Sequence, residues 1–440
     1  MKLFPEQYYC FNPLPAILPN KFVFHENTNT CIKTVFLNTN LIMKLFPNVV
    51  HGIISALNSI FVEQKKADHV IEKLLKSNPK WGSRDRRFIA ESVYSVVRWY
   101  RLYYEIMGHQ PQNNQDWWGI LGIHWLLKGE ELPAFEEFKH LDQQQVFQRQ
   151  KTLSEFLKIK ASIPNWLDEL GQKELGENWE ATVLELNQEQ NVCLRVNTLK
   201  TTVQNCVAEL HQEGIDVQQK ENTTLILTKR AKLTHLKSFK NGNFEVQDEG
   251  SQLIAPFLAP LPGTLVIDAC GGAGGKSLHL ASLMKNKGQI ISMDIHAHKL
   301  HELNKRSKRA GVKIIETKLI SDQNLQELKE SADYLLLDVP CSGLGVLKRN
   351  PDAKWKLNLD FISTIKTIQQ QIIQNYSKLL KPKGRMVYAT CSILPSENEG
   401  QVNHFLNSPA GTNFKLLKQA SILPQSSGTD GFYMALLEKN

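Results

Sequence analysis

Two cysteines each follow an apolar segment that has the pattern of a buried strand. Cys341 stands in Asp338-Val-Pro-Cys-Ser-Gly343, and Cys391 stands in Thr390-Cys-Ser392. Because the carboxyl ends of parallel strands meet at the ligand-binding edge of a sheet, we expect these two thiols and the Asp338 carboxylate to meet there. A single cysteine after a strand is usually just a small apolar residue. Two at matching strand ends, one of them after an Asp-x-Pro turn, favour a chemical role.

The chemistry that fits this set is covalent activation of a pyrimidine ring. Carbon 5 of cytosine is a poor nucleophile, but a thiolate that adds to carbon 6 turns carbon 5 into an enamine-like atom that attacks a methylsulfonium group. Such catalysis needs a cysteine with a lowered pKa. It also needs an acid at the edge of the base, which Asp338 supplies if a dry site keeps it protonated. An enzyme that methylates an amine would have an aromatic residue where this chain has Cys341.

A glycine-rich segment lies upstream, in Leu265-Val-Ile-Asp-Ala-Cys-Gly-Gly-Ala-Gly-Gly-Lys-Ser277. Glycines let the backbone approach a ligand closely, and the following helix offers its N-terminal N–H groups. A P-loop would have its first glycine where Cys270 stands, and a dinucleotide loop counted from Gly272 would have glycine at Ser277. Leu335-Leu-Leu-Asp338 nevertheless resembles a strand that binds Mg²⁺, so an ATP-dependent enzyme stays an alternative.

S-adenosylmethionine is the third possible ligand, and it carries no phosphate that would require either of those loops. A glycine turn would hold its methionine end, and an acid at the end of the next strand would bind its ribose hydroxyls. Asp294 lies at the carboxyl end of the expected strand 289–295, 26 residues after Asp268, which is the expected place in an open α/β sheet. We therefore predict S-adenosylmethionine as the cofactor, with Asp294 at the ribose.

Composition and charge set the class of protein. The 440 residues are too many for one core and indicate two or three domains. A net charge of +8 fits a polyanion partner such as RNA. The chain has neither an apolar run that could span a bilayer nor a secretory signal, and its seven scattered cysteines match neither a disulfide framework nor a zinc pattern. We expect a cytoplasmic monomer with no membrane or metal partner, since His298 and His301 lack a third ligand.

Three folded regions are predicted. Residues 43–160 have apolar side chains at helical spacing, and residues 161–245 mix short helices and strands in a small α+β module. From 246 to 440 strands alternate with helices, which implies a doubly wound, Rossmann-like and mostly parallel sheet. Residues 1–42 are expected to be a disordered extension or to precede the true start, because Met1-Lys-Leu-Phe-Pro5 recurs at Met43.

The expected order of elements in 246–440 follows from the same patterns. Helices are expected to begin at Leu278, His298 and Phe361, and the last should continue to Leu380, where Pro382 and Gly384 stop it. The expected parallel strands are 264–269, 289–295, 312–316, 334–339 and 384–390, with a closing antiparallel pair at 414–417 and 431–437.

These motifs together resemble the bacterial Sun (Fmu) family of ribosomal RNA cytosine-C5 methyltransferases. The likeness extends from about residue 45 to the C-terminus, and its strongest segments are 246–252, 268–277, 338–355, 388–392 and 397–399. The helical region resembles the NusB-like RNA-binding domain of this family, and 194–198 resembles its small RNA-contacting module. The implied fold is an all-α RNA-binding domain, a small α+β module and a class I methyltransferase domain with a mostly parallel seven-stranded sheet.

The resemblance implies that Cys391 is the nucleophile, that Cys341 assists product release and that Asp338 contacts the cytosine. The implied cofactor site consists of Cys270, Gly271, Gly272, Ala273, Gly274, Gly275, Lys276, Asp294 and Asp338. The implied substrate is small-subunit (16S) ribosomal RNA, in an unpaired or opened loop because the target base must leave its stack. The expected RNA contacts are Arg195, Asn197, Lys348, Arg349, Lys354 and Trp355.

The chain departs from the family pattern in two places. The usual loop Ala-Ala-Pro-Gly-Gly-Lys reads Gly271-Gly-Ala-Gly-Gly-Lys276 here, and the missing proline removes a restraint on the backbone. The acid that contacts adenine in the family falls near Leu319, and the nearest acid is Asp322. A non-catalytic RNA-binding scaffold stays a third hypothesis beside the methyltransferase and the ATP-dependent enzyme.

Overall fold

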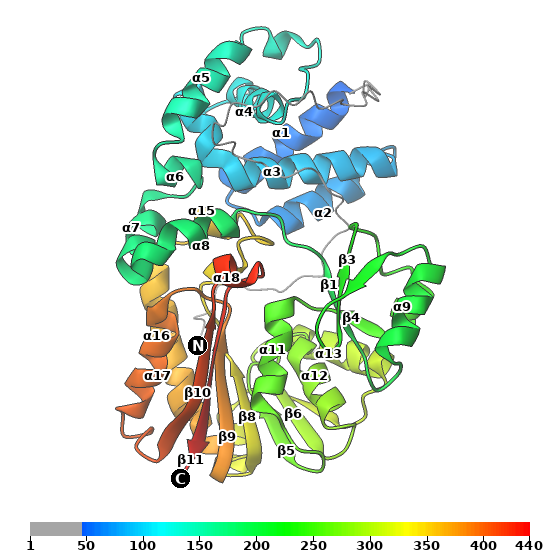
Figure 1. The fold of residues 1–440 in the computed structure, drawn as a ribbon, viewed down its shortest axis with the longest axis vertical. Coiled ribbons are helices and arrows are strands. Elements are labelled where there is room, and N and C mark those ends of the chain that lie inside the picture. Colours follow the sequence, from blue (N-terminus) through cyan, green and yellow to red (C-terminus); the bar gives the residue numbers. More distant parts are fainter. Residues whose placement is uncertain (1–45) are drawn as a thin grey trace, which may run out of the picture. The chain divides into compact units, whose positions relative to one another are not determined.

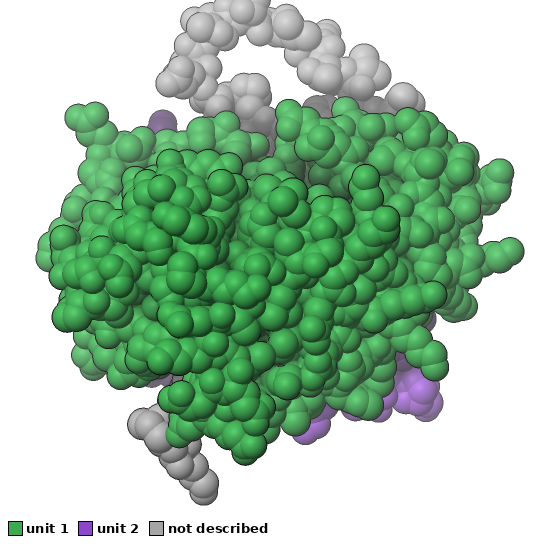
Figure 2. All heavy atoms as spheres, turned by 90° about the horizontal axis from the view of Figure 1, so that it is seen from below, with its two compact units in different colours: residues 1–14, 154–440 green, residues 15–153 purple. Residues whose placement is uncertain are grey.

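The computed structural model describes residues 46–440, so the expected extension 1–42 lies outside the described residues. The described part of the chain forms two compact units, residues 46–153 and residues 154–440 (Figure 2). The sequence patterns put the end of the helical region near residue 160, whereas the first unit ends at Leu153.

Helices make up the regular structure of residues 46–153. They are α1 Pro47–Phe61, α2 Ala67–Ser77, α3 Ser83–Met107, α4 Asn114–Leu127 and α5 Gln143–Leu153, with a short 3₁₀ turn at Glu136–Phe138 (Figure 1). In α1, Val50, Ile53 and Leu57 are fully buried, which is the spacing of one helix face. The helical periodicity therefore predicts this unit correctly.

Residues 154–246 carry the small α+β module. Its antiparallel sheet has the order β2-β3-β1-β4. The strands are β1 Cys193–Val196, β2 Val217–Gln219, β3 Thr224–Leu227 and β4 Phe244–Val246, and the helices are α6 Leu157–Lys160, α7 Asn165–Leu175, α8 Trp179–Leu186, α9 Val203–Gln212 and α10 Lys237–Lys240. The sequence patterns miss β4, because three residues form a strand here only through their pairing with β1.

The large sheet has seven strands in the order β10-β11-β9-β8-β5-β6-β7. The five from β9 to β7 are parallel, and β11 and β10 close the sheet as an antiparallel pair, so the predicted mostly parallel seven-stranded sheet is confirmed. The strands are β5 Leu265–Asp268, β6 Gln289–Asp294, β7 Ile315–Leu319, β8 Ala332–Asp338, β9 Leu380–Thr390, β10 Phe414–Ile422 and β11 Phe432–Lys439.

Helices cover both faces of this sheet. Neighbouring residues of one strand point to opposite faces. Val266 belongs to a core cluster with residues of α11, α12 and α13, whereas Ile267 belongs to a cluster with residues of α16 and α17. The helices of this region are α11 Glu249–Leu258, α12 Gly275–Leu283, α13 Ala297–Ala310, α14 Asp322–Glu327, α15 Ala353–Lys356, α16 Leu359–Tyr376, α17 Glu399–Leu406 and α18 Pro424–Ser427. The result is the three-layer arrangement that alternation of strands and helices predicts.

Several expected boundaries are wrong. The third parallel strand begins at Ile315 rather than 312, and α12 begins at Gly275 rather than Leu278. The strand β9 begins at Leu380 rather than 384, so α16 ends at Tyr376 rather than at Leu380, and β10 continues to Ile422 rather than 417. Leu380 pairs with Ala332, and the register then shifts before Tyr334. At this shift four residues of β9, 381–384, lie opposite Asp333 alone and have no partner in the ladder with β8. Pro382 is one of them, so its missing N–H removes no ladder bond.

Candidate active site

The carboxyl ends of β8 and β9 bring the two predicted cysteines into contact. Asp338, the last residue of β8, is paired with Ala389 in the parallel register. The loops that follow set Cys341 Sγ 3.2 Å from Cys391 Sγ, and the Cys391 N–H points to Cys341 Sγ at 3.3 Å. The expectation that these two thiols meet at one edge of the sheet is therefore confirmed.

The two thiols differ in exposure, and the pKa of Cys341 is raised. Cys341 is buried, and Cys391 is only partly buried. The hydrogen bond with Cys391 and then burial raise the pKa of the Cys341 thiol well above its ordinary value, so Cys341 keeps its proton at neutral pH. Cys391 is thus the sulfur that a substrate can reach, and Cys341 is a proton-bearing neighbour.

A buried carboxylate, Glu397, holds both of the loops that carry the cysteines. Glu397 is fully buried. Its Oε1 accepts from the hydroxyls of Ser342 (2.5 Å) and Ser392 (2.6 Å), the residues that directly follow the two cysteines. Its Oε2 accepts from the Ser342 N–H at 2.8 Å and from Gln369 Nε2 at 3.0 Å. Hydrogen bonds to a charged acceptor are the strong ones, so Glu397 fixes the two loops relative to each other.

The glycine loop lies at the end of β5, next to β8, and turns into α12. Gly271 and Gly274 have no room for a side chain: a Cβ would lie 2.0 Å from Ser292 Oγ at the first and 2.5 Å from Leu303 Cγ at the second, where φ is +86°. At Gly272, by contrast, no atom of the described residues beyond its chain neighbours lies within 4 Å of such a Cβ. Glycine there lets a ligand approach the backbone, as a bound cofactor requires.

Asp294 ends β6 beside this loop, as predicted. Its Oδ2 accepts from the Gly272 N–H at 3.1 Å, and its Oδ1 accepts from the His296 N–H at 2.8 Å. Lys299 Nζ lies 3.7 Å from Oδ2. The acid thus sits at the open part of the loop, where a carboxylate can receive hydroxyl donors.

Lys276 connects the loop to the end of β8, because its Nζ lies 2.6 Å from Asp338 Oδ2. Cys270, the first residue of the loop, is a poor nucleophile. Burial first, and then the carboxylates of Asp268, Asp338 and Asp294, raise the pKa of its thiol well above the ordinary value. The loop thus offers backbone and charge rather than a reactive sulfur.

Asp268 lies beneath the loop and carries a shifted pKa. Burial raises the pKa of this carboxyl to about 7, against the opposing effect of the Ser277 hydroxyl, which donates to Oδ2 at 2.5 Å. An unfolded Asp has a pKa of about 3.9. Between about pH 4 and pH 7, therefore, Asp268 carries a proton in the folded protein but not in the unfolded chain.

Four of the six expected RNA contacts are wrong. Arg195, Asn197, Lys348 and Lys354 are at most 3% exposed. Asn197 Nδ2 donates to the carbonyls of Gly242 (2.8 Å) and Ala310 (2.9 Å). Buried polar groups need such partners, so the Asn197 side chain serves the interior.

The two lysines of this group hold α8 and the residue after it. Lys348 Nζ lies 2.5 Å from Glu185 Oε1, and Lys354 Nζ lies 3.0 Å from Asn187 Oδ1. Of the remaining two expected contacts, Arg349 is exposed and Trp355 is half-buried. Arg349 Nε donates to Asp430 at 2.6 Å. Arg349 and Trp355 stay predictions as RNA contacts.

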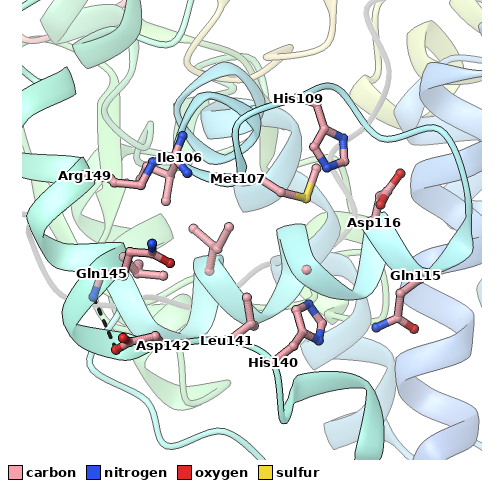
Figure 3. A pocket seen from close by; sticks show the side chains of 13 residues that line it. Ile106, Met107, His109, Gln115, Asp116, His140, Leu141, Asp142, Gln145 and Arg149 are labelled. Atoms are coloured by element: carbon pink, nitrogen blue, oxygen red, sulfur yellow. Dashed lines mark hydrogen bonds between the residues drawn. The ribbon is translucent and has the colours of Figure 1, made fainter.

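The helical unit contains a pocket of about 310 Å³ between α3, α4 and α5 (Figure 3). Its polar rim is engaged within the protein. Asp116 accepts from the Gln112 N–H at 2.7 Å, and Arg149 Nη2 donates to the Glu105 carbonyl at 3.0 Å. These groups satisfy helix ends, and we assign no ligand to the pocket. Among residues 46–440, no three acidic, His or Cys side chains are grouped as a metal site, and no helix is long and apolar enough to cross a membrane.

The pKa of Asp268 predicts a pH effect on stability. A carboxyl whose pKa is raised on folding makes the free energy of unfolding fall as pH rises from about 4 to about 7, because the folded state binds more protons in that range. Asp268→Asn should flatten this part of the curve, measured by urea unfolding at intervals of pH. Parallel curves for the two proteins would contradict the assignment.

Comparisons with known proteins place the chain in a family. Residues 255–438 match the family model described as 16S rRNA methyltransferase RsmB/F, and residues 163–234 match the ferredoxin-like domain of RsmF/B-like methyltransferases. A probable ribosomal RNA small subunit methyltransferase B of a Synechocystis species is 32% identical over 425 residues, covering 84% of this chain and 95% of that protein. The Pasteurella multocida ribosomal RNA small subunit methyltransferase B is 34% identical, with 63% and 65% covered.

A solved structure shares this fold. The crystal structure of PH0851 superposes with a TM-score of 0.75 at 27% identity, covering 90% of this chain and all of that one. The sequence motifs, the fold and a full-length relative thus point to the same group of enzymes. The chain belongs to the RsmB/F family of S-adenosylmethionine-dependent 16S rRNA methyltransferases.

Proposed function

We propose that this protein methylates carbon 5 of a cytosine in small-subunit ribosomal RNA through a covalent bond between Cys391 and carbon 6 of the base. The observation that carries the proposal is the 3.2 Å contact between Cys341 Sγ and Cys391 Sγ. A methyltransferase that acts on a nitrogen atom has no use for paired thiols at this edge of the sheet. Ring-carbon methylation needs one sulfur to add and gains from a second that helps it leave.

The first step is addition of the Cys391 thiolate to carbon 6. The sulfur–carbon bond forms as the electrons of the carbon 5–carbon 6 double bond move toward the ring nitrogen. Asp338, at the end of β8, is our choice for the group that contacts that edge of the base, and Lys276 at 2.6 Å is its present partner. This addition makes carbon 5 nucleophilic, which is the purpose of covalent catalysis here.

The second step transfers a methyl group to carbon 5: the new carbon–carbon bond would form as the methyl–sulfur bond of the donor breaks, with S-adenosylhomocysteine as the leaving group. Bound S-adenosylmethionine supplies the electrophilic methyl group. The residues proposed to hold it are those of the loop Cys270 to Lys276, with Asp294 accepting from the ribose hydroxyls. Gly272 supports this assignment, because its backbone is open to a ligand and its N–H is already directed to Asp294. Asp322, exposed in the first turn of α14, is the acid that follows the position near Leu319 where the family has its adenine contact.

The third step is release. A base removes the carbon 5 proton, the double bond reforms, and the bond between Cys391 and carbon 6 breaks. Cys341 is proposed to assist, because its raised pKa keeps a proton on the sulfur next to the departing thiolate. A hydrogen bond to that thiolate lowers the barrier to its departure. The substrate base must leave its stack to reach this edge, so an unpaired or opened loop is the expected target.

The two cysteines predict opposite mutant phenotypes. Cys341→Ala should trap protein on RNA, because addition proceeds while release is slowed, and the adduct should migrate as a shifted band on a denaturing gel. Cys391→Ala should abolish both the adduct and methyl transfer. Cys206→Ala, which removes a buried thiol on α9, is the control and should leave both unchanged. Methylation of cytosine by Cys391→Ala would exclude the proposed nucleophile.

Glu397 predicts a further effect on turnover. Glu397→Gln keeps the shape but removes the charge that four donors share, and a hydrogen bond to a charged group contributes about 1.5–3 kcal/mol. We expect kcat to fall at least about tenfold, with an unchanged KM for S-adenosylmethionine. The control is Glu399→Gln in the same segment, whose carboxylate accepts from the Ser421 hydroxyl at 2.5 Å, away from the two cysteine loops. Equal kcat values for the two variants would argue against this role.

The target can be tested in cells. Bisulfite sequencing of small-subunit ribosomal RNA from a strain without this protein should show one cytosine that has lost its protection. Expression of the wild-type protein should restore it, and Cys391→Ala should not. Restoration by Cys391→Ala would favour the scaffold hypothesis, and persistence of every protected cytosine would exclude this RNA as substrate.

A further inference from the structure

A side chain from outside the glycine loop holds its central residue. Arg306, on α13, donates from Nη1 to the Ala273 carbonyl at 2.9 Å. The same guanidinium donates from Nη2 and Nε to Glu245 Oε2 at 2.8 and 3.2 Å. Glu245 belongs to β4 of the small antiparallel sheet. One arginine therefore joins the loop of the large sheet to a strand of the neighbouring module.

The acid at the far end of this contact is firmly held. Glu245 is 2% exposed, and its other oxygen accepts from Arg309 Nη2 at 2.6 Å. Burial alone would raise the pKa of this carboxyl, but the attraction of Arg306 and Arg309 outweighs it and lowers the pKa below its ordinary value. Glu245 thus stays charged, and each of its carboxylate oxygens accepts a hydrogen bond from an arginine.

The loop has a physical need for such an anchor. Four of the five residues from 271 to 275 are glycine, and Gly272 and Gly274 have positive φ. Glycine loses more conformational freedom on ordering than any other residue, and this loop has no proline to limit that freedom. Fixing the Ala273 carbonyl before the ligand arrives lowers the entropy that binding must remove.

We propose that Arg306 is a positioning residue of the cofactor site, which holds the glycine loop in its binding conformation by connecting Ala273 to Glu245. The proposal rests on the assignment of this loop to S-adenosylmethionine. It makes β4 of the small module a structural part of that site, although β4 itself need not touch the cofactor.

The chain offers a matched control for this idea. Arg309 lies one turn further along α13 and pairs with the same Glu245, but its guanidinium lies over the Phe239 ring at 4.0 Å, whereas the Ala273 carbonyl is bonded by Arg306. Arg306→Met and Arg309→Met each remove one partner of Glu245, and only the first also releases Ala273. A role in stability alone predicts the same result for both.

Equilibrium dialysis of the full-length protein with radiolabelled S-adenosylmethionine gives the readout. Arg306→Met should raise the Kd at least about tenfold, the size of one strong hydrogen bond, and Arg309→Met should raise it less than about threefold. The thermal unfolding midpoints of the two variants should agree. In steady-state assays Arg306→Met should raise the KM for S-adenosylmethionine and leave the KM for RNA unchanged.

Equal Kd values for the two variants, or an unchanged Kd in Arg306→Met, would overturn the proposal. If either methionine variant fails to fold, the pair Arg306→Lys and Arg309→Lys serves the same purpose. A lysine retains the charge but is a compact donor that does not span both partners as the planar guanidinium does. Asp294→Ala separates the two assignments. If Asp294→Ala binds S-adenosylmethionine as tightly as the wild type does, the loop is not the cofactor site. If Asp294→Ala loses binding while the two arginine variants have equal Kd values, only the role of Arg306 is rejected.

Discussion

The parallel pairing of β8 with β9 is the contact on which the candidate site depends. It sets Asp338 beside Ala389, so the loops that carry the two thiols leave the sheet as neighbours. Adjacent strands are about 4.8 Å apart, yet the sulfur atoms of Cys341 and Cys391 are 3.2 Å apart, so the loops must also turn toward each other. Glu397 fixes the two loops in this arrangement by accepting from the hydroxyls of Ser342 and Ser392. The pairing of β8 with β9 therefore brings the two loops together, and buried Glu397 then fixes the two sulfur atoms in contact.

Local patterns predict most of the fold and the centre of the site. The alternation of strands and helices predicts the large sheet, and the positions of Cys341, Cys391 and Asp294 at strand ends predict where those residues meet. Glu397 and Arg306 escape this reasoning, because their partners Ser342 and Glu245 are 55 and 61 residues away in the chain. A sequence pattern that spans a few residues holds no information about such contacts.

The prediction of buried residues as RNA contacts failed for the same reason, namely partners that are distant in the chain. A basic residue in a motif-rich segment reads as a surface charge, since lysine is almost never fully buried without a partner. Lys348 and Lys354 have partners, but Glu185 and Asn187 are 163 and 167 residues away. The same holds for Asn197, which secures the small sheet to the end of α13 through the Ala310 carbonyl. The modules that composition separates are thus joined by buried polar contacts.

Helix α13 is attached to its surroundings at three positions along its length. Lys299 in its first turn faces Asp294, Arg306 reaches Ala273 and Glu245, and Ala310 at its end accepts from Asn197. One residue of an α-helix advances by about 100° around the axis. Deleting or inserting a single residue between Lys299 and Arg306 would rotate one set of attachments away from its partners. The length of this segment is therefore restricted as strictly as its composition, and natural length variation should fall outside it.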